Sequence, residues 1–211
     1  MLLEGLHAVK HALRFAPDLV EQVVVADRVA VRALAERLAP DVAGVLLDRA
    51  QVGPVAHHTG VQALAARPVE DRSVLTDRTG VLVVLDRPRH PGNVGAVVRV
   101  AAAAGCAGVA LVGTLDPWSP AALRGSAGLH YALPVLQVTA DEVAGPVVVL
   151  DAGGSAAALP PGAALVVGSE RSGVGADWRT RADAVLALPM RPGVSSLNLA
   201  TAVAAALYSS G

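Results

Sequence analysis

The first third of the chain alternates between helical and extended patterns of hydrophobic residues. Apolar residues at Leu6, Val9, Ala12 and Leu13 recur at helical spacing, which predicts a helix over residues 5–15. The pattern then predicts a strand over 20–27, a helix over 28–40 that Pro40 ends, a strand over 44–48, a turn or short helix over 51–58 and a strand over 60–66. Such alternation is typical of a small α/β layer unit.

A different pattern begins near residue 80. Five short runs are almost wholly apolar, and they cover residues 80–86, 108–113, 146–151, 164–170 and 184–189. Strands that are buried on both faces have this composition, which predicts a mostly parallel sheet covered by helices. Residues 67–79 are polar, contain Pro68 and show no apolar period, so we expect a linker there. The chain is therefore expected to form two α/β domains, residues 1–66 and 80–211.

Composition narrows the class of protein. The chain has 211 residues, of which 53% are hydrophobic and 17% charged, and no apolar run approaches the roughly 20 residues that span a bilayer. Glu4, His7 and Lys10 interrupt any apolar core of a signal peptide, so we expect a cytoplasmic protein without membrane association. Cys106 is the only cysteine, which excludes an intrachain disulfide and a cysteine zinc cluster. Its alanine-rich surroundings predict a small buried thiol.

The charge gives no global attraction to nucleic acid. The formal net charge is −1, whereas an RNA-binding protein usually carries a basic footprint. Any such footprint must therefore be local. Nearly all of the 17 basic residues are arginine, with Lys10 as the exception, and arginine is suited to bidentate phosphate contacts and to stacking on bases.

The first of three polar motifs follows the apolar run 80–86. Asn93 can cap the helix that comes next, Gly95 lets another backbone approach, and Arg99 lies about one turn further on. Taken alone, the motif is better explained by an ordinary capped helix that carries a solvated arginine.

The other two motifs also follow predicted strands. Gly168, Glu170 and Gly173 follow the run that begins at residue 164, and alone they are compatible with a turn that exposes a glutamate. After Pro189 ends the last strand, the sequence Ser196-Leu197-Asn198 opens an alanine-rich helix whose free N–H groups suit ligand contacts. Open α/β proteins place ligands at such strand ends. A dinucleotide fingerprint and the lysine of a phosphate-binding loop are both missing from the sequence.

Together and in this order, the three motifs resemble motifs one, two and three of the SpoU/TrmH branch of the SPOUT RNA methyltransferases, over roughly residues 80–211. Residues 1–66 are more loosely similar to the small domain, itself like ribosomal protein L30e, of the subfamily that methylates a guanosine ribose in 23S ribosomal RNA. Residues 57–60 stand where those relatives often have a His-Gln-Gly phrase. Two adjacent histidines, His57 and His58, make a poor metal site without carboxylate or cysteine support.

The resemblance implies a fold, a reaction and a set of site residues. The fold would be a SPOUT domain with a mostly parallel sheet and a carboxy-terminal deep trefoil knot, preceded by an L30e-like domain that binds substrate RNA. The enzyme would be a homodimer that transfers a methyl group from S-adenosylmethionine to a ribose 2′-hydroxyl of structured RNA, ribosomal RNA ahead of transfer RNA, without a metal. The implied catalytic residues are Asn93, Arg99, Glu170, Ser196 and Asn198, and the implied cofactor-binding residues are Ala152, Gly168, Leu188, Met190 and Leu197.

Several alternatives stay open. Arg99 could act as a general base or, as the high basicity of a guanidinium favours, as an electrostatic stabiliser. A SPOUT enzyme acting on a base nitrogen is disfavoured by the third motif. A transfer RNA 2′-O-methyltransferase, and a non-catalytic factor that binds RNA or assists ribosome assembly, are the remaining readings. The low positive charge and the few aromatic residues fit the non-catalytic reading.

Overall fold

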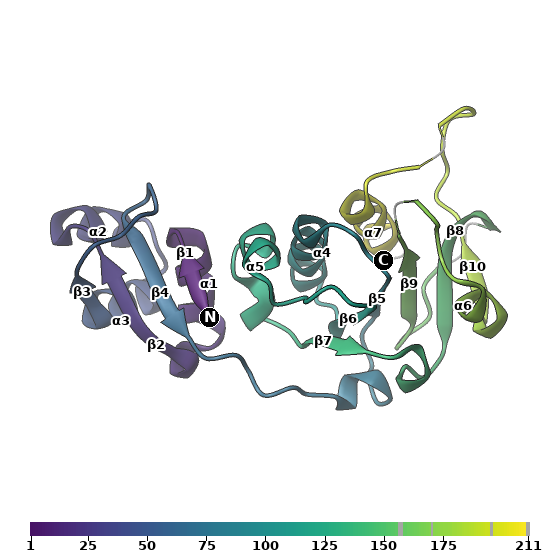
Figure 1. Cartoon of the computed structure of the whole chain (residues 1–211), viewed down its shortest axis with the longest axis horizontal. Helices are drawn as coiled ribbons and strands as arrows, with labels where there is room; N and C mark the ends of the chain where they lie inside the picture. The colour runs from purple at the N-terminus through teal and green to yellow at the C-terminus, as the bar shows by residue number, and fades with distance from the viewer. Residues whose placement is uncertain (156–157, 170, 195, 210–211) are drawn as a thin grey trace.

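The computed structural model describes residues 1–155, 158–169, 171–194 and 196–209. Two β-sheets lie side by side in an elongated molecule, one built from the first 65 residues and the other from residue 82 onward (Figure 1). The first sheet has the order β1-β4-β2-β3. Its strands are β1 (Leu2–Glu4), β2 (Val20–Val25), β3 (Ala50–Val52) and β4 (Val61–Ala65). β4 runs antiparallel to β1 and β2, and β3 runs parallel to β2.

Three helices accompany the first sheet, and one of them corrects a sequence prediction. They are α1 (Leu6–Phe15), α2 (Arg28–Ala35) and α3 (Pro40–Arg49), with a 3-10 turn η1 (Pro17–Leu19). The predicted strand over residues 44–48 is wrong, because this run lies inside α3. Pro40 begins this helix at a position that needs no N–H donor, and Val42 and Leu46 are buried one turn apart. A five-residue apolar run does not distinguish a strand from a helix by itself.

The second sheet has six strands, and all of their pairings are parallel. Its order is β10-β8-β9-β5-β6-β7. The strands are β5 (Leu82–Asp86), β6 (Gly108–Val112), β7 (Val135–Val138), β8 (Val147–Ser155), β9 (Ala164–Gly168) and β10 (Ala184–Leu186). The prediction of a mostly parallel sheet is therefore confirmed. β7 was not predicted, because Gln137 interrupts its short apolar run.

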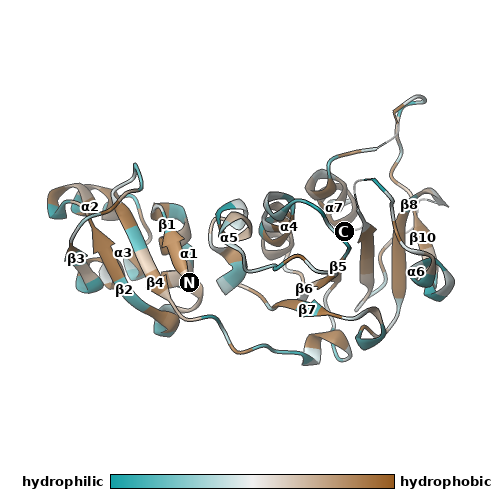
Figure 2. Cartoon of the chain, viewed as in Figure 1, coloured by the Kyte–Doolittle hydropathy of each residue, from teal (hydrophilic) through white to brown (hydrophobic). Residues whose placement is uncertain are grey.

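Helices cover both faces of this sheet. They are α4 (Pro91–Ala103), α5 (Pro120–Ser126), α6 (Ala176–Arg181) and α7 (Leu199–Tyr208), with the 3-10 turns η2 (Ser73–Leu75), η3 (Leu129–Tyr131) and η4 (Ala140–Glu142). Alternate strand residues point to opposite faces. Val83 and Leu85 of β5 belong to the core that includes α4, α5 and α7, whereas Leu82 and Val84 belong to the core with Trp178 of α6. The strands are accordingly hydrophobic along their length (Figure 2).

The strand order reverses between β5 and β9. After β5 the chain continues through α4 to β6 and then β7 on one side, whereas after β9 it continues through α6 toward β10 on the other side. Ligands of open α/β sheets bind in the crevice outside the carboxyl ends of the strands at such a switch point. The fold therefore predicts a ligand site at the segments that follow β5, β8 and β9.

Glycine allows α4 and α5 to cross at close range. A Cβ atom added to Gly95 would lie 2.8 Å from Gly125 Cα and would overlap the carbonyl oxygen of Ala122. Gly95 therefore permits the backbone approach that its motif indicated. The role of Asn93 differs from the prediction, because α4 already begins at Pro91 and His90 occupies the N-cap position. Asn93 lies in the first helical turn and does not cap the helix.

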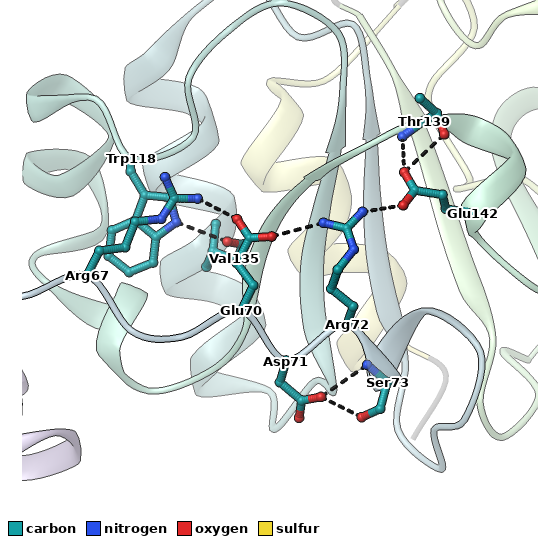
Figure 3. A network of polar contacts seen from close by, with 9 residues as sticks. All are labelled: Arg67, Glu70, Asp71, Arg72, Ser73, Trp118, Val135, Thr139 and Glu142. Atoms are coloured by element: carbon teal, nitrogen blue, oxygen red, sulfur yellow. Dashed lines mark hydrogen bonds and ion pairs between the residues drawn. The ribbon is translucent and has the colours of Figure 1, made fainter.

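A chain of polar contacts holds residues 67–72 against the second sheet (Figure 3). The guanidinium of Arg67 lies 5.2 Å from the ring centroid of Trp118 and donates to Glu70. Glu70 also accepts from Arg72, which reaches Glu142 beyond β7. The segment is thus polar in sequence, as the linker prediction requires, and is ordered by ion pairs.

The two sheets meet through α1. Gly128, which has a φ of +79°, approaches the backbone of Ala8 so closely that an added Cβ would lie 2.8 Å from Ala8 Cα. Arg124 of α5 pairs with Glu4 at 3.2 Å. Figure 1 shows α1 beside α5 at this junction, and buried residues of both parts form one continuous cluster.

Candidate functional site: a cavity at the carboxyl ends of β8 and β9

A cavity of about 520 Å³ opens at the carboxyl ends of β8 and β9, next to the start of α7. Its volume lies within the range of small-molecule sites, about 300–1,000 Å³. The residues that line it come from three segments: Leu150–Ala152, Val167–Val174 in part, and positions between Leu188 and Ala202. Segments far apart in the sequence therefore meet at one point, beside the switch point of the sheet.

All five residues predicted to bind a cofactor line this cavity. They are Ala152, Gly168, Leu188, Met190 and Leu197. Two of the residues predicted to be catalytic, Ser196 and Asn198, line it as well. The structure thus brings these seven side chains or backbones together, while their roles stay predictions.

Gly168 is required by the packing at the end of β9. An added Cβ would overlap the backbone of Gly173 and Val174, which fold back against it. The return is closed by the hydrogen bond from Gly173 N to Ser169 O at 3.0 Å, and Gly173 adopts a φ of +63°. Both glycines of the second motif therefore serve one tight turn. Glu170, the remaining residue of that motif, lies outside the described residues.

Asn198 connects the third motif to the first. Its side-chain oxygen accepts from Ala200 N at 3.0 Å and caps α7, while its Nδ2 donates to Asn93 Oδ1 at 3.3 Å. Asparagine is favoured at a helix N-cap because it satisfies a free N–H of the first turn. The predicted polar start of α7 is confirmed, and Asn93 is thereby held beside the cavity although it does not line it.

Arg99 is not brought to the cavity. It lies on α4 with an exposed side chain, whereas Val97, Val98 and Ala101 of the same helix are buried. Within the described part of the chain, no hydrogen bond or ion pair involves its guanidinium. A single chain therefore presents Arg99 outside the cavity that holds the other predicted residues.

Asp151 is a cavity residue that the sequence analysis missed. It follows the apolar run of β8, which is the position of a polar residue at the carboxyl end of a parallel strand, so a signal was present. The pKa of its carboxyl lies below its usual value because Gly153 N donates to it and Arg179 pairs with it at 2.6 Å. Of the described residues that line the cavity, only Asp151 carries a formal charge at neutral pH.

Other expectations concern metal, membrane and thiol chemistry. In the described ranges, no group of three or more histidine, cysteine, aspartate or glutamate side chains could hold a metal ion. None of the described helices is long and apolar enough to cross a bilayer. Cys106 is half-buried and unpaired, and burial raises the pKa of its thiol to about 11, which keeps it protonated and unreactive.

Comparison with known proteins supports the motif assignment. Residues 80–208 match the SpoU rRNA Methylase family. The 23S rRNA (uridine(2479)-2′-O)-methyltransferase of Streptomyces viridochromogenes is 32% identical over 190 residues, which are 81% of this chain and 64% of that relative. The 23S rRNA (guanosine(2553)-2′-O)-methyltransferase RlmP of Bacillus subtilis is 29% identical over 219 residues, with coverage of 98% and 86%.

A solved structure extends the similarity to the whole chain. The SpoU methyltransferase AviRb from Streptomyces viridochromogenes superposes with a TM-score of 0.78 at 26% identity, covering 100% of this chain and 88% of that chain. AviRb has also been solved in complex with the cofactor AdoMet. The resemblance read from the three motifs is confirmed, and the chain belongs to the SpoU rRNA methylase family.

Proposed function

We propose that the protein transfers a methyl group from S-adenosylmethionine to a ribose 2′-hydroxyl of ribosomal RNA. The observation that carries the proposal is the cavity at the ends of β8 and β9, which is lined by all five residues proposed to bind the cofactor, in a chain of the SpoU family. The similar proteins from Streptomyces viridochromogenes and Bacillus subtilis are named as 23S rRNA 2′-O-methyltransferases.

The described lining fits this cofactor. Leu150, Val167 and Leu188 offer apolar surface for a planar adenine, and the strand end at Gly168 offers backbone polar groups. The carboxylate of Asp151 lines the cavity, and although Arg179 compensates its charge, its oxygens can accept hydrogen bonds from a ligand. The residues proposed to hold the cofactor are therefore Ala152, Gly168, Leu188, Met190 and Leu197, with Asp151 added.

The chemistry requires alignment more than activation. When bound, the cofactor supplies a methyl group on a positively charged sulfur, which is a good leaving group. The chain would then hold the ribose oxygen in line with that methyl group, so that the C–O bond forms as the C–S bond breaks, while the hydroxyl proton is lost to solvent. Arg99 is proposed to stabilise the developing alkoxide or to bind the neighbouring phosphate, because a guanidinium is too basic to accept a proton near neutrality. Asn93, Glu170, Ser196 and Asn198 are proposed to orient these groups.

A homodimer is proposed because one chain separates Arg99 from the cavity. An exposed Arg99 on α4 reaches a reacting ribose if a second copy of the chain presents it to the cavity of the first. Leu197, which lines the cavity and is 41% exposed, offers apolar surface for such a contact. The proposed site is therefore shared between two protomers.

The proposed domain roles follow the two sheets. Residues 1–66 would form an L30e-like domain that selects RNA, residues 67–79 the linker, and residues 80–211 a SPOUT domain with a trefoil knot. Ribosomal RNA is favoured over transfer RNA as the substrate because the relative named for ribosomal RNA aligns with more of this chain. RlmP aligns with 98% of this chain, whereas a solved structure that concerns 2-OH methylation of C/U34 on tRNA covers 63% of it.

Two measurements on one preparation test the proposal. Titration calorimetry with S-adenosylmethionine should give binding of micromolar strength, about −8 kcal/mol. Separate incubations of 23S ribosomal RNA and of transfer RNA, both unmodified, with radiolabelled cofactor should place label only in the ribosomal RNA, in a 2′-O-methylnucleoside after nuclease digestion. Cofactor binding with label in a base, or with label in transfer RNA alone, would contradict the proposed reaction or substrate. Folded protein that binds RNA without binding cofactor would favour the non-catalytic reading.

A further inference from the structure

A second cavity lies at the junction of the two sheets, away from the site described above. Its volume is about 480 Å³, and it is enclosed by α1, the connection between α2 and α3, the end of α4 and η3. Both parts of the chain contribute to it, since Lys10 and Arg37 come from the first and Ala102 and Leu129 from the second. Figure 1 shows α1 and α4 on the two sides of the junction.

The rim of this junction cavity is cationic. Lys10, Arg14 and Arg37 line it. Arg14 also pairs with the exposed Asp41 at 3.1 Å, and an exposed pair of this kind contributes little stability and leaves other guanidinium donors available. In a chain whose net charge is −1, three cations around one cavity form the local basic footprint that RNA binding requires.

An aromatic ring stands beside these cations. Phe15 is the only phenylalanine of the chain, and it lines the junction cavity with 49% of its surface exposed. Both tryptophans are buried, with exposed fractions of 3% for Trp118 and 2% for Trp178. Cations that follow a phosphate backbone, combined with an exposed ring on which a base stacks, are the features of single-stranded nucleic-acid sites.

His11 adds a hydrogen-bonding group. Its Nδ1 lies 2.7 Å from the carbonyl oxygen of Ala127, so Nδ1 donates and the neutral ring leaves Nε2 as an acceptor. Burial is the main reason that the pKa of His11 falls below its ordinary value, and nearby cations, Arg99 among them, lower it further. Arg99 lies about one helical turn before Ala102 and Ala103 of α4, which line the junction cavity.

We infer that the junction cavity binds an unpaired nucleotide of the substrate RNA, with a base against Phe15 and the adjoining phosphates on Arg14, Arg37 and Lys10. The apolar floor, which includes Leu38, Val42 and Leu129, suits the face of a base. This inference rests on the proposed function for the identity of the RNA. The junction cavity shares no lining residue with the cofactor cavity, and it is lined by Ala102 and Ala103 of α4, the helix that carries Arg99.

The experiment uses the full chain and a short fluorescein-labelled RNA hairpin with a mixed-sequence loop. Binding is followed by fluorescence anisotropy over a range of salt concentrations. The double variant Arg14→Ala/Arg37→Ala should bind about tenfold more weakly and lower the salt slope by about 1.4, because each phosphate contact to a single strand contributes about 0.7. The matched control is Arg28→Ala/Arg32→Ala, which removes the same charge from exposed positions of α2 outside the cavity and should change affinity less than about threefold.

Phe15 tests the stacking contact. Phe15→Ala should weaken binding about tenfold, whereas Phe15→Tyr, which keeps a ring, should bind nearly as the unaltered protein does. Ultraviolet cross-linking should attach the hairpin to the peptide that contains Phe15. Equal effects of the two arginine pairs, unchanged affinity in Phe15→Ala, or no binding of the hairpin by the unaltered protein at low salt would each overturn the inference.

Calorimetry with S-adenosylmethionine on the same proteins separates the two proposals. The junction variants should bind the cofactor as the unaltered protein does, because none of the changed residues lines the cofactor cavity. Absence of cofactor binding by the unaltered protein would count against the proposed function while leaving the junction cavity testable with the hairpin. If the unaltered protein transfers methyl groups normally and the junction variants bind the hairpin as tightly as it does, the inference about the junction cavity is overturned and the proposed function stands.

Discussion

Asn198 and Asn93 are 105 positions apart in the chain and share a hydrogen bond of 3.3 Å. The same Asn198 side chain caps α7 through Ala200 N. One amide therefore stabilises the start of the helix beside the cofactor cavity and ties it to the first turn of α4. Both the oxygen and the nitrogen of this amide therefore hold the third motif in place.

Replacement of Asn198 separates these two contacts. Asn198→Ala should lower the free energy of unfolding by about 1 kcal/mol through loss of the cap. Asn198→Asp keeps the acceptor for Ala200 N and loses the donor to Asn93, so it should retain most stability. Urea denaturation measures the stability, and calorimetry with S-adenosylmethionine measures the cavity. Weaker cofactor binding in Asn198→Asp at near-normal stability is expected if the tie to α4 positions the cavity, and equal loss of stability in both variants would contradict the assigned cap.

Gly168 is predicted to tolerate no side chain. In Gly168→Ala the new methyl group meets the backbone of Gly173 and Val174, so the turn after β9 must move out of the cavity wall. Overpacking of this kind costs about 1–3 kcal/mol, and cofactor affinity should fall at least about tenfold, the equivalent of 1.4 kcal/mol.

The control for this substitution is Gly44→Ala. Gly44 is exposed in α3 and an added Cβ would meet nothing within 4 Å. Alanine is the better helix former, so this change should raise the free energy of unfolding by about 0.5–1 kcal/mol. Thermal denaturation with and without cofactor compares the pair, and normal cofactor affinity in Gly168→Ala would show that the cavity wall is elsewhere.

His130 predicts a pH dependence of stability. It is fully buried with Nδ1 2.7 Å from Ser126 Oγ and Nε2 2.8 Å from Pro117 O. Burial lowers the pKa of its imidazole to about 4, from an ordinary value of 6.5. The unfolded chain therefore binds a proton at a higher pH than the folded chain does. The contribution of His130 to stability is complete above pH 6.5 and is lost as the pH falls toward 4, with a slope of up to about 1.4 kcal/mol per pH unit.

Urea denaturation at several pH values tests this window. His130→Gln should be less stable than the unaltered protein at pH 7.5, because neither buried partner keeps its ideal geometry. The difference between the two proteins should narrow as the pH is lowered from 6.5 to 4. A difference that stays constant over this range would mean that His130 is not the titrating group.

Replacement of Arg99 should reduce methyl transfer without changing cofactor binding. Because Arg99 is exposed on α4 and outside the cofactor cavity, Arg99→Ala should leave stability within about 0.5 kcal/mol and cofactor affinity unchanged. Methyl transfer to ribosomal RNA should fall by about 100-fold or more, as expected for loss of a group that stabilises developing charge. Arg179 is unsuitable as the control position because its side chain contacts Asp151 in the cofactor cavity. The control is Arg28→Ala, at an exposed position of α2. Parallel loss of cofactor binding and transfer would contradict the assigned role.

Predictions from the sequence are correct where the residue types along a segment indicate that it is buried. The strands predicted within residues 80–86 and 164–170 correspond to β5 and β9, which are central parallel strands, since strands covered on both faces are hydrophobic over most of their length. The strand predicted over residues 44–48 is wrong, because five residues are too few to establish a period. Pro40 begins the helix α3 there and does not end the preceding one.

What the sequence by itself determined was local: which residues are buried, where strands end, and which polar residues follow them, including the three motifs that identify the family. The tertiary structure decided what these positions meet. It inserted β9 between β5 and β8, joined residues 150–152, 167–169, 173–174 and 196–199 around one cavity, left Arg99 outside that cavity, and brought Arg37 of the connection between α2 and α3 to the cavity that Phe15 of α1 lines. Side-chain periodicity reports the environment of each element, whereas strand order and cavities arise from contacts between distant elements, which no local pattern specifies.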